Sequence, residues 1–345
     1  MKTHVPGGAR PQLLDTRGRS LQDLRISVTD RCNFRCNYCM PEEVFGPGYK
    51  FLERDELLSF EEILRLAGLL VERGVSRIRV TGGEPLVRRN LDRLLAMLSA
   101  LPGLDDLSLT TNGSLLPAQA AGLADAGLRR VTVSLDSLDE AAFKAMNSVG
   151  ASVTAVLAGI DAAVAAGLAP VKINAVVRRG LNDHTVVDLA RHFRGTGCIV
   201  RFIEYMDVGN TNGWQLGEVV PAAEILSLID AAFPLEAVPP NHAGEVARRW
   251  RYRDGAGEVG VITSVSQPFC SSCRRLRLSP EGSLFTCLFA GQGTDLRAPL
   301  RAGATDDALG AILDRVWSRR DDQYSEIRSQ ATRDLPRVEM SRIGG

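Results

Sequence analysis

The chain has 345 residues, 45% of them hydrophobic and 24% charged, which is the composition of an ordinary globular protein with its own core. Its 41 Lys and Arg residues balance 41 Asp and Glu residues, so it lacks the basic surplus of nucleic-acid-binding and membrane-surface proteins. No apolar run approaches the roughly 18 residues of a membrane-spanning helix, and residues 1–10 contain no apolar secretory segment. We therefore expect a cytoplasmic protein, in which disulfides are rare and the seven cysteines serve another purpose.

The first two thirds of the chain alternate short β-rich segments with amphipathic helical segments. The expected strands cover residues 24–29, 77–81, 107–111, 130–135, 171–177 and 199–205. The expected helices cover residues 61–73, 91–101, 117–126, 140–146, 153–166 and 185–193, and three of them end at Gly74, Gly127 and Gly167. Six strand–helix repeats predict an α/β fold with a parallel sheet, either open or curled into a barrel. Its functional residues should follow the C-terminal ends of the strands.

The pattern changes after Met206. Residues 207–217 are rich in Gly and Asn and predict a long functional loop. A short helix (224–233), a proline-rich linker (234–244), two strands (250–252 and 259–263), a β-hairpin (274–279 with 284–285) and a helix beyond residue 307 should follow. We divide the chain into an N-terminal segment (1–22), a barrel region (23–233) and a C-terminal region (234–345) that ends in Gly344-Gly345.

Three cysteines, Cys32, Cys36 and Cys39, follow the first expected strand with the spacing C-x3-C-x2-C. Three thiolates on one short loop converge easily on one metal centre. A structural zinc ion and a 4Fe–4S cluster both normally take four protein ligands, so three cysteines favour a cluster with one iron open to a small molecule. The alternatives are a zinc site completed by a distant His or Cys and three unrelated core thiols, and the specificity of the spacing argues against both.

A second group, Cys270, Cys273 and Cys287, has the spacing C-x2-C-x13-C. Zinc is a fair alternative here because C-x2-C is a common zinc half-site, but the nearest histidine, His242, lies in the expected linker. A second cluster with an open iron fits the number of cysteines better. The remaining Cys198 stands at a strand start and is expected to be a small buried hydrophobic residue.

The first cysteine group resembles the motif of the radical S-adenosylmethionine superfamily. In that superfamily the motif holds a 4Fe–4S cluster whose open iron chelates S-adenosylmethionine, and an electron from the cluster cleaves this cofactor to a 5′-deoxyadenosyl radical. Gly82-Gly83-Glu84-Pro85 looks like the superfamily's cofactor-binding motif, in which Gly83 lets the backbone approach the cofactor. The resemblance implies further cofactor contacts from Tyr38, Ser134 and Met206. From the residues alone, Ser134 would cap a turn and Met206 would fill the core.

The two cysteine groups together are similar to the MoaA family, the GTP 3′,8-cyclases of molybdenum cofactor biosynthesis. The match covers essentially the whole chain. Its most specific markers are Thr29-Asp-Arg-Cys-Asn-Phe-Arg-Cys, Arg79-Val-Thr-Gly-Gly-Glu-Pro-Leu, Leu109-Thr-Thr-Asn-Gly, Arg201-Phe-Ile-Glu-Tyr-Met-Asp-Val-Gly and Phe269-Cys-Ser-Ser-Cys. The resemblance implies an incomplete (β/α)6 TIM-like barrel, with a C-terminal extension that carries a second 4Fe–4S cluster and closes the barrel.

The family's substrate contacts carry over to matching positions of this chain. The open iron of the second cluster meets the guanine, while arginines and a lysine hold the ribose and triphosphate. The implied substrate contacts are Arg25, Arg79, Thr110, Lys172, Arg201, Arg275, Leu276 and Arg277. Catalytic roles are implied for Arg25, Arg275, Arg277, Gly344 and Gly345. The last two form a tail that enters the active site, whereas composition alone would favour a frayed end.

The resemblance also implies a reaction and its partners. The radical takes hydrogen from C3′ of GTP, the C3′ radical attacks C8 of guanine, and reduction gives 3′,8-cyclo-7,8-dihydro-GTP, so the enzyme is a carbon–carbon bond-forming lyase. The implied partners are GTP, a flavodoxin- or ferredoxin-like electron donor, and the next pathway enzyme, cyclic pyranopterin monophosphate synthase. The chain itself is expected to be a monomer or homodimer. Two alternatives stay open: a radical enzyme that modifies a peptide or protein, and a non-catalytic zinc or electron-carrier protein.

Overall fold

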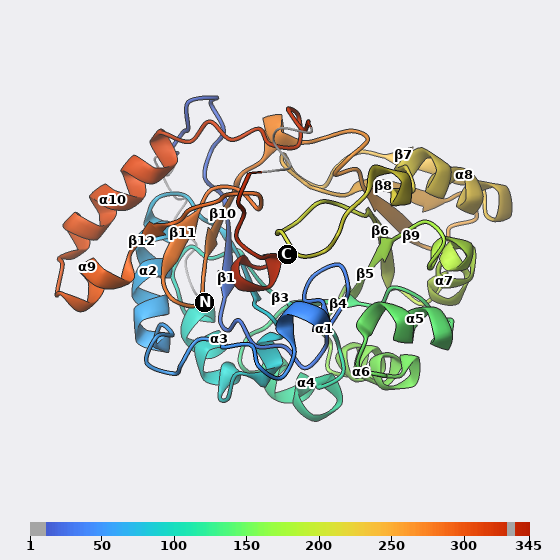
Figure 1. The fold of residues 1–345 in the computed structure, drawn as a ribbon, viewed down its shortest axis with the longest axis horizontal. Helices are drawn as coiled ribbons and strands as arrows, with labels where there is room; N and C mark the ends of the chain where they lie inside the picture. The colour runs from blue at the N-terminus through green and yellow to red at the C-terminus, as the bar shows by residue number, and fades with distance from the viewer. Residues whose placement is uncertain (1–11, 330–334) are drawn as a thin grey trace, which may run out of the picture.

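A computed structural model describes residues 12–329 and 335–345 (Figure 1), so residues 1–11 of the expected N-terminal segment lie outside it. Six strands run parallel to their neighbours along the chain: β1 (Asp23–Ser27), β2 (Arg77–Thr81), β3 (Asp106–Thr111), β4 (Arg130–Ser134), β5 (Lys172–Val177) and β6 (Ile199–Glu204). The connecting helices are α2 (Phe60–Glu72), α3 (Leu91–Ser99), α4 (Leu116–Asp125), α5 (Glu140–Asn147), α6 (Val153–Ala165) and α7 (Val186–Phe193). The expected strands and helices are confirmed to within a residue or two at their ends.

Local signals begin and end these helices. Ser59 caps α2 in a capping box, in which its hydroxyl accepts from the Glu62 amide and the Glu62 carboxylate accepts from the Ser59 amide. The expected C-cap glycines Gly74, Gly127 and Gly167 all have positive φ, which glycine adopts at little cost. The helices cover the outer face of a curved sheet (Figure 1), and the apolar side chains between the two layers form the main core.

The C-terminal region adds strands to both edges of this six-stranded sheet. β10 (Arg275–Leu278) runs parallel beside β1, and β9 (Glu258–Ile262) runs parallel beside β6. The antiparallel strands β11 (Ser283–Phe285) and β12 (Thr294–Asp295) continue from β10, while β8 (Arg248–Tyr252) and β7 (Leu235–Val238) continue from β9. The sheet therefore has the order β12-β11-β10-β1-β2-β3-β4-β5-β6-β9-β8-β7. This is an α/β fold of the TIM-like barrel kind with a large, mostly parallel sheet.

The expected linker over residues 234–244 is wrong in its first part, because β7 occupies Leu235–Val238. Its prolines stand on either side of the strand, at Pro234 and at Pro239-Pro240, where they remove no hydrogen bond from the pairing with β8. The expected hairpin is confirmed as β10 and β11, and the expected short helix as α8 (Ala222–Ala232).

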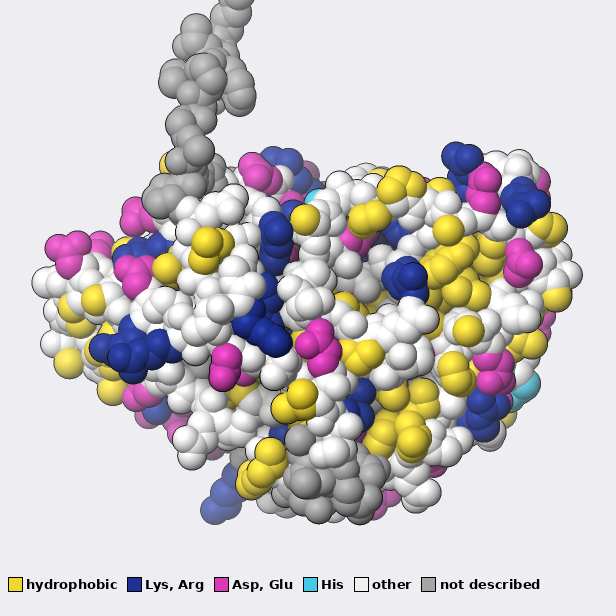
Figure 2. Space-filling model, turned by 90° about the horizontal axis from the view of Figure 1, so that it is seen from above, with side chains coloured by type: hydrophobic (Ala, Val, Ile, Leu, Met, Phe, Trp, Pro, Cys, Tyr) yellow, Lys and Arg dark blue, Asp and Glu magenta, His cyan; other side chains and the backbone are white. Residues whose placement is uncertain are grey.

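The remaining α-helices of the described residues are α1 (Glu42–Phe45) after the first cysteine group, α9 (Arg297–Arg301), α10 (Asp306–Ser318) and α12 (Met340–Ile343). The chain ends at the centre of the molecule, between the β1 and β6 sides of the sheet (Figure 1). No helix of the described residues is long and apolar enough to cross a membrane. On the face shown in Figure 2, basic, acidic and apolar side chains are interspersed among the described residues.

Candidate active site

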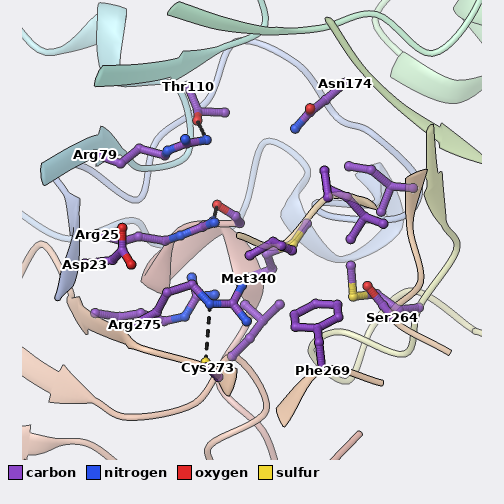
Figure 3. A pocket seen from close by; sticks show the side chains of 18 of the residues that line it. Asp23, Arg25, Arg79, Thr110, Asn174, Ser264, Phe269, Cys273, Arg275 and Met340 are labelled. Atoms are coloured by element: carbon purple, nitrogen blue, oxygen red, sulfur yellow. Dashed lines mark hydrogen bonds between the residues drawn. The ribbon is translucent and has the colours of Figure 1, made fainter. Parts of the chain in front are cut away.

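The inner face of the sheet encloses a cavity of about 270 Å³ that brings together residues far apart in the sequence (Figure 3). Among the residues that line it are most of the predicted substrate contacts: Arg25, Arg79, Thr110, Lys172, Arg201, Arg275 and Arg277. Leu276 is 1% exposed and its side chain packs in the main core on the other face of β10. Because side chains alternate along a strand, Leu276 presents only its backbone toward this side.

Three arginines form a row across neighbouring strands. Arg25 on β1 is in register with Arg79 on β2 and with Arg277 on β10. Two residues earlier on β1, Asp23 is in register with Arg275 on β10 and with Arg77 on β2. The Asp23 carboxylate forms an ion pair with Arg77 at 2.7 Å. The parallel pairing of β10 with β1 therefore places Arg277 beside Arg25, although the two residues are distant in sequence.

The cations of this cavity repel one another. Burial, together with Arg277 and Arg79, lowers the pKa of Arg25 well below its usual value. Burial and the charge of Arg275 lower the pKa of Arg277 to about 9. Burial lowers the pKa of Lys172 to about 7, with Arg201 the largest of the neighbouring charges. A polyanion such as a nucleotide triphosphate would relieve this repulsion.

The C-terminal tail enters this cavity. The backbone carbonyl of Gly345 accepts a hydrogen bond from Arg25 Nη1, and that of Gly344 accepts one from Arg277 Nη1. Ile343, just before them, is fully buried. The tail is therefore not a frayed end, because its last two residues contact two of the three arginines in the row.

The first cysteine group lies on the loop between β1 and α1. A turn closes over it, in which the Cys39 and Met40 amides donate to the Cys36 carbonyl at 2.9 and 2.8 Å. Arg35 fixes the loop by donating to the carbonyls of Cys32, Phe34 and Phe45, each at 2.8 Å. Short-range backbone contacts thus hold the three thiols on one compact loop.

The chemistry of these thiols fits a metal cluster. Burial and the charge of Glu84 raise the pKa of Cys32 to about 11. Burial raises the pKa of Cys36 and of Cys39 as well, and the neighbouring thiols add to it. Cysteine binds metals as the thiolate, so this loop needs a cationic centre to hold its three sulfur atoms in that form.

Tyr38, which lies in the loop of the first cysteine group, lines the same cavity as Ser134 and Met206. The Tyr38 hydroxyl donates to Asp136 Oδ2 at 3.0 Å, and the Val176 amide donates to Asp136 Oδ1 at 2.9 Å. Burial raises the pKa of Asp136 to about 6. Sequence reasoning gave Asp136 only a turn-capping role, although its place two residues after the predicted cofactor contact Ser134 was a signal.

Gly83 is packed against the first cysteine loop rather than lining the cavity. A Cβ atom there would overlap the Arg31 carbonyl and stand 2.9 Å from the Asp30 carbonyl. The Gly83 amide donates to Thr29 O at 2.7 Å, and the Glu84 amide donates to Arg31 O at 2.8 Å. The glycine is therefore needed for close approach of two backbone segments, which holds the end of β2 against the cysteine loop.

Glu84, in the same motif, is a buried carboxylate that links neighbouring loops, a latch role that sequence reasoning did not assign to it. It is 1% exposed and accepts from the Asn112 amide and the Thr111 hydroxyl, both at 2.7 Å. Asn112 in turn donates to the Asn33 side chain in the cysteine loop at 2.8 Å. Three successive segments at the C-terminal ends of β1, β2 and β3 are thereby tied together.

The second cysteine group, Cys270, Cys273 and Cys287, lines the cavity from the side of the C-terminal region. Arg275 Nε donates to Cys273 Sγ at 3.3 Å (Figure 3). Burial would raise the pKa of Cys273, but the charges of Arg275 and Arg320 outweigh it and lower the pKa to about 6. Burial raises the pKa of Cys287 to about 11. Cys273 is therefore more ready than Cys287 to bind a metal as thiolate.

A buried ion-pair network supports the second group from behind. Asp15 Oδ2 pairs with Arg19 at 2.6 Å and with Arg320 at 3.2 Å, and all three residues are at most 7% exposed. Arg19 donates to the Cys270 carbonyl and Arg320 donates to the Cys273 carbonyl, both at 2.8 Å. Residues that precede and follow the barrel thus fix the backbone of two predicted ligands.

No three Cys, His, Asp or Glu side chains within the described ranges converge as the ligands of a single metal ion do. Cysteines that bind a 4Fe–4S cluster each bind a separate iron atom, so this finding concerns a mononuclear site alone. Cys198 is 8% exposed within the main core, as expected for a small buried residue.

Replacing Cys198 by alanine is expected to leave the iron content unchanged. Its side chain packs among apolar residues of the main core, just before the start of β6 and outside both cysteine groups of the sequence. We expect a fall in stability of about 1 kcal/mol from the lost sulfur, which a melting curve would show. A fall in iron on anaerobic metal analysis would contradict the assignment of Cys198 to the core.

Two family models match the chain. The family described as "Radical SAM superfamily" matches residues 26–193, which contain the first cysteine group. The family described as "Molybdenum Cofactor Synthesis C" matches residues 198–326, which contain the second. A protein of Acidothermus cellulolyticus named "GTP 3′,8-cyclase" is 58% identical over 319 residues, covering 91% of this chain and 88% of that protein. The chain belongs to the GTP 3′,8-cyclase family.

Other comparisons agree with membership of the GTP 3′,8-cyclase family. A protein of the same name from Staphylococcus haemolyticus is 47% identical over 338 residues, which cover 97% of this chain and 99% of that protein. Among solved structures, Streptococcus suis SuiB bound to S-adenosylmethionine covers 92% of this chain and 73% of its own, with a TM-score of 0.61. At 14% identity, SuiB shows the shared barrel fold alone. As a GTP 3′,8-cyclase, the chain is an enzyme that uses S-adenosylmethionine and an iron–sulfur cluster.

Proposed function

We propose that this enzyme binds GTP in the cavity between its two cysteine groups and joins C3′ to C8 there, as a carbon–carbon bond-forming lyase. The row of Arg277, Arg25 and Arg79 carries the proposal, because it places three guanidinium groups in register on one wall of the cavity. Guanidinium groups bind phosphate oxygens in a bidentate manner, and a nucleoside triphosphate carries about four negative charges. Thr110, Lys172, Arg201, Arg275 and the backbone of Leu276 complete the proposed substrate site.

We propose that the second cysteine group holds a second 4Fe–4S cluster whose open iron meets the guanine. Its three cysteines line the same cavity as the arginine row. Arg275 links the two, because it donates a hydrogen bond to Cys273 and interacts electrostatically with Asp23, which lies beside the row. The barrel region (23–233) then supplies the first cluster, and the C-terminal region (234–345) supplies the second. Strands β9 and β10 at opposite edges of the six-stranded sheet support a closing role for that region.

The chain's own residues have separate roles in the proposed reaction. When bound, the first cluster and S-adenosylmethionine supply the 5′-deoxyadenosyl radical that takes hydrogen from C3′ of GTP. Tyr38, Ser134 and Met206 orient the cofactor, and the Tyr38 hydroxyl is itself held by Asp136. Gly83, the other predicted cofactor contact, acts by holding the end of β2 against the loop of the first cysteine group. Arg25, Arg275 and Arg277 hold the substrate so that C3′ faces the radical, and the Gly344-Gly345 tail excludes water from that side.

Anaerobic metal analysis tests the two-cluster proposal. We expect about eight iron and eight sulfide per chain, since each 4Fe–4S cluster contributes four of each. About four iron with one zinc would leave the first cluster in place and overturn the second. The reading as a peptide-modifying radical enzyme is not favoured, because the relatives are GTP 3′,8-cyclases along nearly the whole chain.

We also propose the partners of this site. The clusters need a one-electron donor of the flavodoxin or ferredoxin kind, and the reactive cyclised product calls for a following enzyme, cyclic pyranopterin monophosphate synthase. We propose a cytoplasmic location, which suits a chain whose seven cysteines are not joined in disulfides. Whether the enzyme works as a monomer or a homodimer follows from light scattering of the holoenzyme.

GTP affinity is expected to rise as the pH falls from 8.5 to 6, because of Lys172. Its pKa in the nucleotide-free protein lies at about 7, so the ammonium form is lost above neutrality and triphosphate binding must restore it. Replacing Lys172 by methionine should weaken GTP binding roughly 10- to 100-fold at pH 6, the loss of one charge-assisted hydrogen bond.

Calorimetric titration of the holoenzyme with GTP across this pH range gives the measurement. The matched control is Lys172→Arg, whose side chain stays charged, so its affinity should change less with pH than that of the wild type. The γ-phosphate of GTP titrates in all three proteins and cancels in the comparison. Parallel pH profiles for the wild type and Lys172→Met would contradict the assignment of Lys172 to the triphosphate.

A further inference from the structure

The glycine-rich loop that follows Met206 contacts the chain segment leading to the C-terminus. Asp207 is 3% exposed and its carboxylate accepts from the Tyr324 hydroxyl at 2.6 Å and from Arg328 Nε at 3.0 Å. The same carboxylate forms an ion pair with Arg337 at 3.3 Å. One buried anion thus joins the end of β6 to residues on both sides of positions 330–334.

The next residues of the loop bind the tail itself. The carboxylate of Glu339 accepts from the Asn210 amide at 2.9 Å and from the Thr211 hydroxyl at 3.1 Å. Asn210 and Arg337 form two reciprocal hydrogen bonds: the Arg337 amide donates to Asn210 Oδ1 at 3.1 Å, and Asn210 Nδ2 donates to the Arg337 carbonyl. These contacts lie a few residues before Gly344 and Gly345.

A side chain at Gly209 would have to displace the Glu339 carboxylate. The φ of Gly209 is +64°, and a Cβ atom there would overlap a Glu339 carboxylate oxygen and stand 2.8 Å from Glu339 Cδ. Gly213, at the other end of the loop, has a similar φ of +60° but no atom within 4 Å of such a Cβ. The tail therefore packs against Gly209 specifically, and Gly213 shares only the backbone conformation.

The loop is also fastened to strand β6. Asn212 Nδ2 donates to the Met206 carbonyl at 3.0 Å, and Trp214 Nε1 donates to the Tyr205 carbonyl at 2.9 Å. The Tyr205 hydroxyl donates to the Asn212 carbonyl at 2.8 Å. The loop is thus a rigid extension of the strand end that carries the proposed cofactor contact Met206.

We propose that residues 207–213 form a clasp that positions the Gly-Gly tail in the cavity. The positioning residues are Asp207 and Gly209 in the clasp and Glu339, their neighbour on the tail segment. The proposal rests on the proposed catalytic role of Gly344 and Gly345. The clasp and Arg342, which pairs with Glu281 at 3.0 Å, hold the tail on two sides. The Gly345 and Gly344 carbonyls then reach Arg25 and Arg277 without a further ordering step when GTP binds.

Two alanine variants of the holoenzyme test the clasp. In Gly209→Ala, hydrogen exchange of the peptide covering residues 335–345 should accelerate roughly tenfold or more, since the Glu339 carboxylate must give up its contacts to Asn210 and Thr211 and the tail loses that anchor. The kcat for product formation should fall by at least the same factor of about ten, while reductive cleavage of S-adenosylmethionine continues. Gly213→Ala bears the same backbone strain and should leave both exchange and kcat close to wild type.

A double-variant cycle separates contact from strain. In a Glu339→Ala background the carboxylate that a Cβ at position 209 would strike is absent, so adding Gly209→Ala should have little further effect on tail exchange. Glu339→Ala alone should accelerate tail exchange through the lost contacts to Asn210 and Thr211. Because Glu339→Ala introduces no bulk, it keeps the test valid if Gly209→Ala fails to fold.

The outcomes separate the clasp from the role of the tail. Unchanged tail exchange in Gly209→Ala and Glu339→Ala would overturn the clasp, as would equal effects of Gly209→Ala and Gly213→Ala. Accelerated tail exchange with wild-type product formation would support the clasp but overturn the proposed catalytic role of Gly344 and Gly345. Accelerated exchange with lost kcat in Gly209→Ala, and neither in Gly213→Ala, is the result that we expect.

Discussion

Deleting Gly344 and Gly345 is expected to reduce GTP cyclisation by roughly 100-fold or more, while iron content and reductive cleavage of S-adenosylmethionine stay at wild-type levels. The two carbonyls accept hydrogen bonds from Arg277 and Arg25, and a hydrogen bond to a charged group is worth about 1.5–3 kcal/mol. Losing both frees two arginines of the row and opens the cavity to water. Anaerobic product assays, with 5′-deoxyadenosine counted in parallel, give both quantities.

Two point variants control this truncation without changing the chain length. Gly344 has φ +75°, and a Cβ there would overlap Thr81, so Gly344→Ala should displace the tail and reproduce most of the loss. A Cβ on Gly345 would meet only the flexible Met340 side chain, at 3.0 Å from its sulfur, so Gly345→Ala should remain active. Wild-type turnover in the truncated protein would refute the role of the tail.

Removing one cysteine from each group is expected to separate the two halves of the reaction. Cys36→Ala should abolish cleavage of S-adenosylmethionine and with it all cyclisation, because its loop is the proposed site of the first cluster. Cys273→Ala should retain cleavage but lose cyclisation, since the proposed second cluster lies on the substrate side of the cavity. Each variant should lose about four iron atoms per chain.

The Cys198→Ala protein is the matched control for both cysteine variants, because it removes a thiol from the core alone. Iron analysis, 5′-deoxyadenosine and cyclised product are measured on all three proteins. A Cys273→Ala enzyme that cyclises GTP at the wild-type rate would rule out the second group as a cluster site. Loss of cleavage in Cys273→Ala with full iron in the first group would contradict the division of labour.

Much of the barrel follows from local sequence. Apolar periodicity and cap glycines such as Gly74 locate the six parallel strands and their helices because each signal acts within one element. The placement of β10 beside β1 does not follow, because strand order depends on contacts between residues about 250 positions apart in the chain. The register that aligns Arg277 with Arg25 and Arg79 was therefore visible only in the fold.

The candidate site divides in the same way. The cysteine spacings stand in the sequence and point to clusters by themselves, whereas Ser134 and Met206 needed the family resemblance, since each has an ordinary structural explanation. The latch at Glu84 and the ion pairs of Asp15 with Arg19 and Arg320 join distant segments, and no local pattern marks such contacts. The same holds for the clasp at Gly209, whose partner Glu339 lies near the other end of the chain.

The most direct test of the account is to incubate the reduced holoenzyme with S-adenosylmethionine and each of GTP, ATP, CTP and UTP in turn. We expect 3′,8-cyclo-7,8-dihydro-GTP with GTP alone, formed together with one 5′-deoxyadenosine per product, and no cyclised product from the other three. Cleavage of S-adenosylmethionine without any cyclised guanine nucleotide, under conditions in which both clusters are intact, would contradict the account.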